Sequence, residues 1–314
     1  MAWLLAAALS VVLWGGTATA ELPAYQRVSG VSGNLSSVGS DTLANLMALW
    51  TEAFRNLYPD VYVQVQAAGS STAPPALIQG TSNFGPMSRP MSANELGAFR
   101  KKHGYRPLGL RVALDALAIY VHKDNPLGSL SIEAIDAVFS ATRRCGGTVN
   151  ISTWGELGLT GSWAGRPIQP HGRNSASGTY GFLKTAALCS GDFKNTVSEH
   201  PGSASVVEAV TSSLNGIGYS GIGYETPGVR AVAVSRRGDS PAVRASFENA
   251  VDRSYPLARY LYIYVNKRPG TPLAPLEAEF LKLVLSGDGQ RLVVRHGQIP
   301  LPYEIAEREL EKLH

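Results

Sequence analysis

The sequence predicts an α/β fold in two lobes that are joined by two crossover strands. The chain has 314 residues, which at roughly 100–200 residues per domain suggests two domains. Short β-rich runs alternate with segments of helical periodicity, as in α/β proteins. Two similar β-rich stretches, residues 116–123 and 259–267, are each followed by a turn that contains Pro. We interpret them as the strands that connect the lobes.

These crossover positions divide the chain. Residues 21–117 and 262–314 would form the first lobe, and residues 118–261 the second lobe, so that the first lobe is built from both ends of the sequence. The alternative is two unrelated buried strands, which periodicity alone does not exclude.

The remaining elements follow from the spacing of apolar side chains. Residues 43–58 have helical spacing and residues 62–66 alternate as in a strand. Further helices are expected to begin at residues 74–78 and 182–188 and to cover residues 275–285. The charged segment 303–313 predicts a last helix with a solvated face.

The N-terminus predicts an exported protein. Residues 2–14 are almost all apolar, no charged side chain precedes Glu21, and the sequence 17–20 is Thr-Ala-Thr-Ala. This pattern is typical of a signal peptide, residues 1–20, that is cleaved after Ala20 and leaves the mature chain in the periplasm. A membrane anchor is the alternative, but the apolar run is shorter than the roughly 20 residues that span a bilayer.

The two cysteines, Cys145 and Cys189, predict a disulfide bond, since an even count in an exported chain favours pairing. The bond would close a loop of about 45 residues and contribute about 4 kcal/mol on the chain-entropy model. Two free buried thiols are the alternative. A zinc site is disfavoured because two Cys without nearby His do not complete its shell.

Three polar segments precede helix-like runs and indicate an oxyanion site. They are residues 39–42 (Gly-Ser-Asp-Thr), 69–72 (Gly-Ser-Ser-Thr) and 173–179 (Arg-Asn-Ser-Ala-Ser-Gly-Thr). A helix N-terminus has unpaired N–H groups and a partial positive charge, which favour tetrahedral anions. Ser and Thr hydroxyls add donors without adding charge. An ordinary N-cap looks the same, so the prediction depends on three such segments occurring together.

Arg173 is the strongest single candidate, because a guanidinium can bond two oxygens of an anion at once. The alternative is a surface arginine paired with a carboxylate. Arg89, in the segment Met87-Ser88-Arg89-Pro90, is the second candidate, with a solvated loop arginine as its alternative.

The chain resembles the periplasmic phosphate-binding proteins of bacterial phosphate ABC transporters. The resemblance lies in the order of the leader, the three polar segments and residues 84–90 along the chain. The segment 173–179 is the most specific part of the resemblance, which extends over nearly the whole mature chain. It implies the two-lobed periplasmic binding protein fold, inorganic phosphate as ligand, a membrane permease as partner, a monomer, and no enzymatic activity or cofactor. The candidate phosphate-binding residues are Ser40, Asp41, Thr42, Ser70, Ser71, Ser88, Arg89, Arg173, Ser177, Gly178 and Thr179.

The chain departs from the family pattern at acidic positions. Ser88 stands where the family has an Asp, Ser175 stands where it has an acid, and Asp41 stands where many members have Thr. A buried carboxylate accepts the proton that phosphate keeps at neutral pH and repels sulfate, which has none. We hypothesise that Asp41 replaces the acid missing at Ser88. The alternative is that Asp41 only caps the helix that follows it.

Other functional classes are less well supported by the sequence. A net charge of +4 with dispersed Lys and Arg gives no nucleic-acid signature. Residues 216–221 match a dinucleotide fingerprint by letter, but we expect a strand and turn there. The histidines at 103, 122, 171, 200 and 296 show no metal-ligand spacing, and His171 is expected in a surface loop. A binding protein for sulfate or molybdate stays open. An exported phosphatase would need a metal cluster or an activated nucleophile, which we do not find in the sequence.

Overall fold

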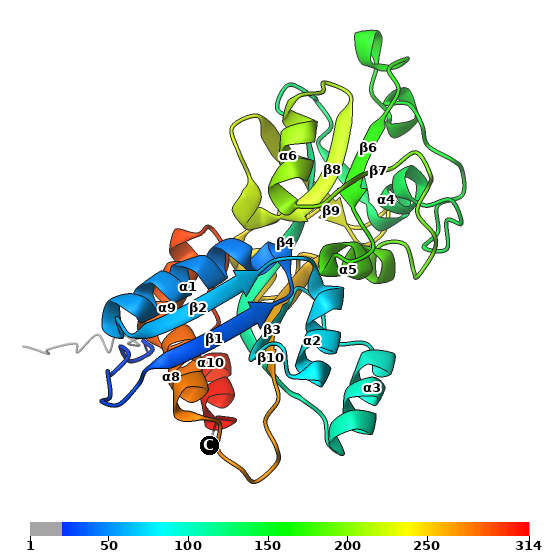
Figure 1. The fold of residues 1–314 in the computed structure, drawn as a ribbon. Helices are drawn as coiled ribbons and strands as arrows, with labels where there is room; N and C mark the ends of the chain where they lie inside the picture. The colour runs from blue at the N-terminus through cyan, green and yellow to red at the C-terminus, as the bar shows by residue number, and fades with distance from the viewer. Residues whose placement is uncertain (1–20, 314) are drawn as a thin grey trace, which may run out of the picture.

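The computed structural model describes residues 21–313, and the signal peptide predicted for residues 1–20 lies outside this range. Figure 1 shows two lobes, with both ends of the described chain in the same lobe. Between residues 21 and 313, no helix is both long and apolar enough to cross a membrane.

The first lobe is a sheet with helices on both faces. Its strands follow the order β2 (Val61–Gln66), β1 (Gly33–Val38), β3 (Phe84–Met87), β10 (Ala258–Val265) and β4 (Leu108–His122). β1 is parallel to β2 and β3, whereas β10 is antiparallel to β3 and β4.

Alternating side chains of β10 show how both faces of this sheet are covered. Leu261, Ile263 and Val265 belong to the main core, together with residues of α1 (Ala44–Leu57), α8 (Pro275–Leu285), α9 (Gly287–Arg295) and α10 (Tyr303–Glu311). Tyr262 and Tyr264 pack on the other face against α2 (Ala73–Gln79) and α3 (Ala93–His103).

The second lobe continues the same sheet. β8 (Gly216–Gly221) is antiparallel to the second half of β4 and parallel to β6 (Gln169–Arg173), which pairs with β7 (Ser198–His200). β9 (Val229–Ser235) pairs with β4 and with β5 (Ser129–Ser131). The helices are α4 (Ile132–Phe139), α5 (Gly178–Ala186), α6 (Ser203–Thr211) and α7 (Phe247–Val251). The described chain also has short 3-10 helices. In the first lobe these are η1 (Asp41–Leu43) and η2 (Ser70–Thr72), and in the second lobe they are η3 (Gly155–Leu157), η4 (Gly161–Trp163) and η5 (Ile222–Tyr224).

β4 is the strand along which the sheet passes from one lobe to the other. Its residues up to Ala116 pair with β10, and its residues 117–121 pair with β8. β10 starts where the second lobe ends, and the Leu117 N–H donates to the Leu257 carbonyl at this point. The two-lobed α/β architecture is therefore confirmed, with strands at both expected crossover positions, while the lobe boundaries after residues 117 and 261 stay predictions.

Most predicted elements agree with the structure to within a few residues, namely the helices at 43–58, 74–78, 275–285 and 303–313 and the strands at 62–66 and 216–221. The helix expected to begin at residue 182 is the exception, since α5 begins at Gly178 and ends at Ala186. Its start is fixed by Ser177, whose hydroxyl accepts hydrogen bonds from the N–H groups of Thr179 and Tyr180.

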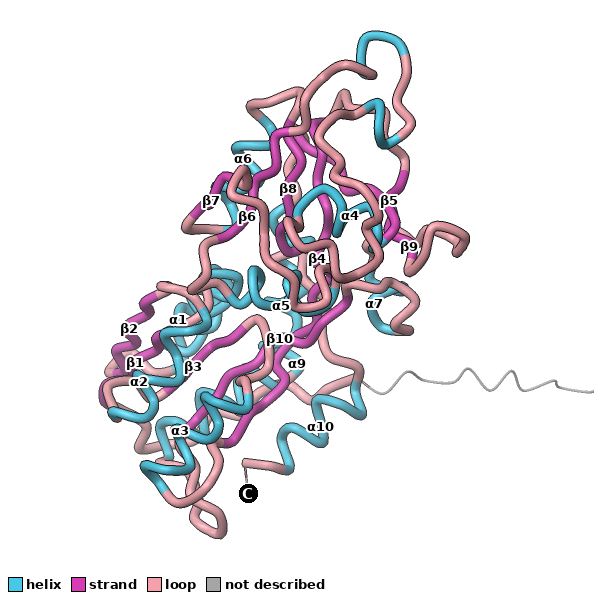
Figure 2. The backbone as a smooth tube through the Cα atoms, turned by 90° about the vertical axis from the view of Figure 1, so that its right-hand side faces the viewer, coloured by secondary structure: helices cyan, strands magenta, loops and turns pink. Residues whose placement is uncertain are grey.

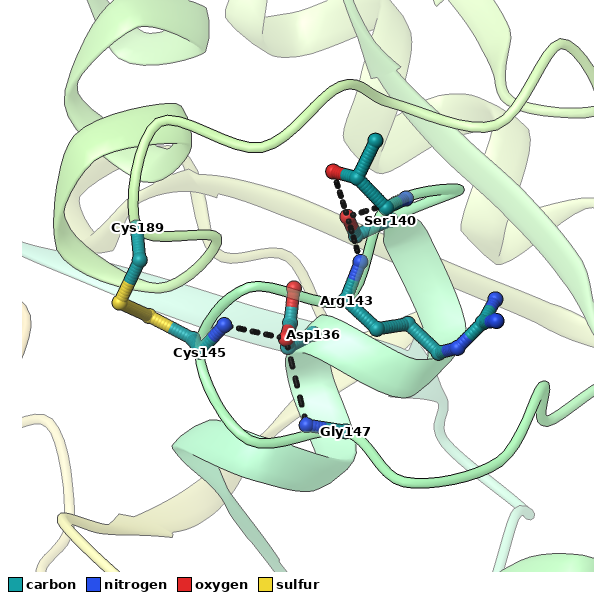
Figure 3. The surroundings of a disulfide bond; sticks show 7 residues. Asp136, Ser140, Arg143, Cys145, Gly147 and Cys189 are labelled. Atoms are coloured by element: carbon teal, nitrogen blue, oxygen red, sulfur yellow. Dashed lines mark hydrogen bonds between the residues drawn. A yellow bond between two sulfur atoms is a disulfide. The ribbon is translucent and has the colours of Figure 1, made fainter.

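The predicted disulfide is confirmed. Cys145 and Cys189 are bonded with their Cα atoms 5.0 Å apart, which joins the loop after α4 to the segment after α5 (Figure 3). The Asp136 carboxylate also accepts hydrogen bonds from the N–H groups of Cys145 and Gly147. The loop is therefore held to α4 and to the end of α5 by separate contacts.

Removing this bond should destabilise the protein. For the variant Cys145→Ser/Cys189→Ser we expect the free energy of unfolding to fall by about 4 kcal/mol, because the unfolded chain regains the entropy of a long loop. Urea unfolding followed by circular dichroism measures the difference. A reducing agent should lower the stability of the wild-type protein toward that of the variant and leave the variant unchanged. Equal stability of the two oxidised proteins would contradict the prediction.

Candidate functional site

Four helix starts converge where the two lobes meet. η1 and η2 come from the first lobe, and α5 and α6 come from the second lobe. Figure 2 shows α5 between the lobes, and the hydroxyls of Thr42 and Thr179 lie 3.0 Å apart across the interface. The Ser71 N–H donates to the Ala176 carbonyl at 3.0 Å, also between lobes. The three polar segments singled out in the sequence are thus adjacent in space.

The interface is closely packed and mostly buried. Ser40, Thr42, Ser70, Ser88, Ser177 and Thr179 are all buried. A Cβ atom placed on Gly178 would lie 2.2 Å from the Ser70 hydroxyl oxygen and 2.6 Å from that of Ser88. Only a glycine lets the backbone of α5 come this close to the first lobe, and backbone N–H groups at such a position can reach a small anion.

The first lobe contributes hydroxyl groups that bond one another. Ser70 and Ser88 have their hydroxyl oxygens 3.3 Å apart, and the Ser88 N–H donates to the Ser70 oxygen at 3.0 Å. Ser40 is fixed through its backbone, since its N–H donates to the Pro86 carbonyl at 2.8 Å. These short contacts hold the segments after β1, β2 and β3 together as one donor surface.

Arg173 is a buried cation at the end of β6. Its residue is 2 % exposed. Its Nη1 donates to the Ser203 hydroxyl at 2.7 Å and its Nη2 to the Pro201 carbonyl at 2.8 Å. Its Nε has no hydrogen-bond partner among residues 21–313. A buried guanidinium with an unused donor is costly unless an anion completes its bonding.

Burial lowers the pKa of the Arg173 guanidinium below its usual range, and the Asp41 carboxylate is the largest of the effects that oppose this shift. The group stays charged nonetheless, because arginine does not lose its proton in proteins. The site therefore has a fixed positive charge of the second lobe facing an acidic side chain of the first lobe.

Asp41 bonds to the other lobe. Its Oδ2 accepts a hydrogen bond from the Ser203 N–H at 2.7 Å and lies 3.3 Å from the Arg173 Nη1. Within the described residues its side chain forms no capping bond to its own helix, where Ser40 holds the N-cap position. The capping alternative is thus wrong for η1, and Asp41 instead caps α6 across the interface.

Arg89 and Ser71 lie at the edge of this cluster. Arg89 donates to both carboxylate oxygens of Glu95 at 2.7 Å and to the Ser71 hydroxyl at 3.2 Å. Burial would raise the pKa of Glu95, but the bonds from Arg89 and Ser92 outweigh it and hold that pKa below its usual value. Arg89 therefore has a carboxylate partner, and its role in binding an anion stays a prediction.

The contribution of α6 to this site was not predicted from the sequence. Ser203 is 1 % exposed and bonds to both Arg173 and Asp41. The preceding Gly202 and the run Ser-Ala-Ser repeat the Gly/Ser signal of the other three segments. The same argument from helix starts could therefore have found this fourth segment.

His171 lies on β6 rather than in the expected surface loop, which corrects that expectation. Its Nδ1 is 3.1 Å from the Nε2 of His200 on the neighbouring strand β7. Burial, and to a lesser extent the charge of His200, lowers the pKa of His171. Across residues 21–313, no three His, Cys, Asp or Glu side chains are grouped so as to hold a metal ion.

A sheet that passes through two lobes, and a buried polar site where the lobes meet, define the class of two-lobed solute-binding proteins. Residues 25–288 match the model of the PBP superfamily domain. The chain belongs to this superfamily and, within it, to the family of the phosphate-binding protein PstS.

The relatives support this assignment. The chain is 58% identical to the phosphate-binding protein PstS of Pseudomonas aeruginosa over 316 residues, which covers 98% of both chains. It is 26% identical to protein SphX of Synechococcus elongatus, over 88% of this chain and 80% of that protein. A Clostridium perfringens structure, described as a phosphate ABC transporter substrate-binding protein with bound phosphate, superposes with a TM-score of 0.72 at 26% identity. It matches 86% of this chain and 100% of its own.

Proposed function

We propose that the protein binds inorganic phosphate between its two lobes and delivers it to the membrane permease of an ABC transporter. The observation that carries the proposal is the buried guanidinium of Arg173, with an unused Nε donor, where helix starts of both lobes meet. The name of the Pseudomonas aeruginosa relative supports phosphate as the ligand.

The binding site consists of donors from both lobes. Its proposed ligand-binding residues are Ser40, Asp41, Thr42, Ser70, Ser71, Ser88, Arg89, Arg173, Ser177, Gly178 and Thr179. Hydroxyls and backbone N–H groups donate to the phosphate oxygens, Arg173 supplies the charge, and closure of the lobes removes water and strengthens each contact. The lobes close as in other periplasmic binding proteins, by a hinge motion.

The location and partners follow from this role. The signal peptide, residues 1–20, is cleaved on export, and the mature protein acts as a monomer in the periplasm without nucleic acid or enzymatic activity. The membrane permease recognises the closed form of the protein. The relatives named as binding proteins support a non-enzymatic role.

Titration calorimetry tests the proposal. The mature protein should bind phosphate much more tightly than sulfate or molybdate at neutral pH. Tighter binding of sulfate or molybdate would show that the ligand is an oxyanion other than phosphate. An absence of binding to all three anions would remove the proposal.

Asp41 should set the choice between phosphate and sulfate, because a carboxylate accepts the phosphate proton and repels the fully ionised sulfate. In Asp41→Asn we expect the ratio of sulfate to phosphate affinity to rise by at least about tenfold, toward the discrimination of about 10⁴ seen for such sites. Competition calorimetry measures the ratio, and Asp60→Asn, an exposed acid of the same lobe, is the matched control. An unchanged ratio in Asp41→Asn would assign selectivity elsewhere.

A further inference from the structure

A second buried guanidinium lies beside the proposed phosphate site. Arg259, on β10, is 6 % exposed. Its Nε and Nη2 donate to Oδ2 of Asp115 at 3.0 and 2.7 Å. Asp115 is the register partner of Arg259 on β4 and is fully buried. The two crossover strands therefore carry one ion pair where they run side by side.

Arg259 also contacts the helix α5. Its Nη2 donates to the Thr179 hydroxyl at 3.0 Å, and its guanidinium lies over the Phe182 ring, 5.2 Å from the centroid. Asp115 accepts a bond from the Ile222 N–H at 3.2 Å through its other oxygen. The ion pair thus contacts both α5 and η5 of the second lobe.

The bond from Arg259 determines whether the Thr179 hydroxyl acts as a hydrogen-bond donor or acceptor toward its other neighbours. A hydroxyl has one proton to donate and two lone pairs with which it accepts. Arg259 cannot accept a hydrogen bond, so in this contact Thr179 is the acceptor and its own proton points elsewhere. The Thr42 hydroxyl lies 3.0 Å away on the other lobe, and Gly178, the residue before Thr179, faces Ser70 and Ser88. The proton of Thr179 is therefore available within the interlobe cluster.

The contact depends on lobe closure. Arg259 and Asp115 face each other on the two crossover strands, where β10 pairs with β4, whereas Thr179 begins a helix that lies wholly in the second lobe. Separation of α5 from the first lobe breaks the bond between Arg259 and Thr179 and leaves the bond to Asp115 intact. Nη2 then keeps its bond to Asp115 but has one N–H group without a partner, in addition to Nη1, which has no partner within the described chain even in the closed form.

We propose that Arg259 is a positioning residue of the phosphate site, which turns the Thr179 hydroxyl into a donor toward the anion only when the lobes are closed. This inference rests on the proposed function, because it requires that an oxyanion binds beside Thr179. Arg259 itself acts through Thr179, and its charge is balanced by Asp115.

A double-mutant cycle between Arg259 and Thr179 tests the inference. Arg259→Gln should lower phosphate affinity by about 10- to 100-fold, since hydrogen bonds to charged groups are among the strong ones. In a Thr179→Val background the same change should lower affinity by less than about threefold, because the hydroxyl through which it acts is gone. Equal losses in both backgrounds would overturn the proposal.

Arg259→Lys separates the hydrogen bond from the charge. The lysine side chain ends one bond short of Nη2, so that it keeps a cation near Asp115 and loses the bond to Thr179. We expect nearly wild-type thermal stability without ligand but the reduced affinity of Arg259→Gln. Wild-type affinity in this variant would show that charge alone suffices and would contradict the positioning role.

Two further variants control for folding. Arg259→Gln leaves a buried carboxylate unpaired, so Asp115→Asn/Arg259→Gln serves where the single variant is unstable, with the same expected loss of affinity. Arg111→Gln is the matched control. Arg111 lies on β4, the strand that carries Asp115, and pairs with the fully buried Glu309 of α10, away from the site. It should lower stability and leave affinity unchanged.

The outcomes also separate this inference from the proposed function. If the wild-type protein binds sulfate or molybdate instead of phosphate, the proposed function is wrong, and the cycle run with that anion still decides the role of Arg259. If the wild-type protein binds no oxyanion, both are wrong. If phosphate binds and the cycle shows no coupling, only the inference about Arg259 is wrong.

Discussion

Arg173→Gln should lose phosphate binding almost entirely. The side chain is the buried cation of the proposed site, and truncating one member of a buried, hydrogen-bonded charge pair costs about 2–5 kcal/mol, or at least about 30-fold in affinity. Calorimetry with phosphate measures the loss. Arg173→Lys keeps the charge but cannot bond two oxygens at once, and we expect an intermediate affinity.

Arg166→Gln is the matched control for this prediction. Arg166 belongs to the same lobe, stacks on Trp163 with 4.8 Å between the guanidinium carbon and the ring centroid, and donates to the Ser162 carbonyl. Its loss should leave affinity unchanged. Wild-type affinity in Arg173→Gln, with a normal thermal midpoint, would exclude Arg173 from the binding site.

Gly178→Ala should weaken phosphate binding while leaving the fold at least as stable. The added methyl group would lie 2.2 Å from the hydroxyl oxygen of buried Ser70, so that the lobes cannot close without a shift. Overpacking of this kind costs about 1–3 kcal/mol, which corresponds to about a 5- to 150-fold loss of affinity. Alanine also favours the helix over glycine by roughly 0.5–1 kcal/mol, so the ligand-free variant should not melt earlier.

Small-angle scattering adds a direct measure of closure. The wild-type protein should contract on addition of phosphate, and Gly178→Ala should contract less. Gly165→Ala is the control, because a Cβ at Gly165 meets no atom within 4 Å among the described residues. Unchanged affinity and contraction in Gly178→Ala would show that α5 does not approach the first lobe as closely as the structure places it.

The sequence predicted those parts of the site that depend on local signals. Gly and Ser before helical periodicity marked the segments at η1, η2 and α5, although α5 begins at Gly178 and its start was expected at residue 182. Caps and tight backbone approaches need these residue types nearby in the chain. Arg173 was found because it stands next to such a segment. The local signal could not say that Asp41 bonds to α6, since its Ser203 partner is 162 residues away.

Pairs that depend on sheet register were not predicted. Asp115 and Arg259 are 144 residues apart and face each other only because β4 and β10 pair antiparallel in one register. In the sequence Asp115 stands inside an apolar run and Arg259 near the start of another, and neither position indicates a partner. Periodicity can place two strands in a sheet, but it does not tell which residues become neighbours across it.

The first lobe can be completed only after the C-terminal part of the chain has been synthesised. β3 pairs with β10 on one side, and Phe84 stacks on Phe280 of α8. The N-terminal strands therefore lack these packing partners until the C-terminal segments have been synthesised. The second lobe, from the middle of the chain, has most of its strands and helices together earlier. A nascent chain of this topology therefore exposes apolar strand surface until its synthesis is nearly finished, and C-terminal truncations that remove β10 and α8 leave that surface uncovered.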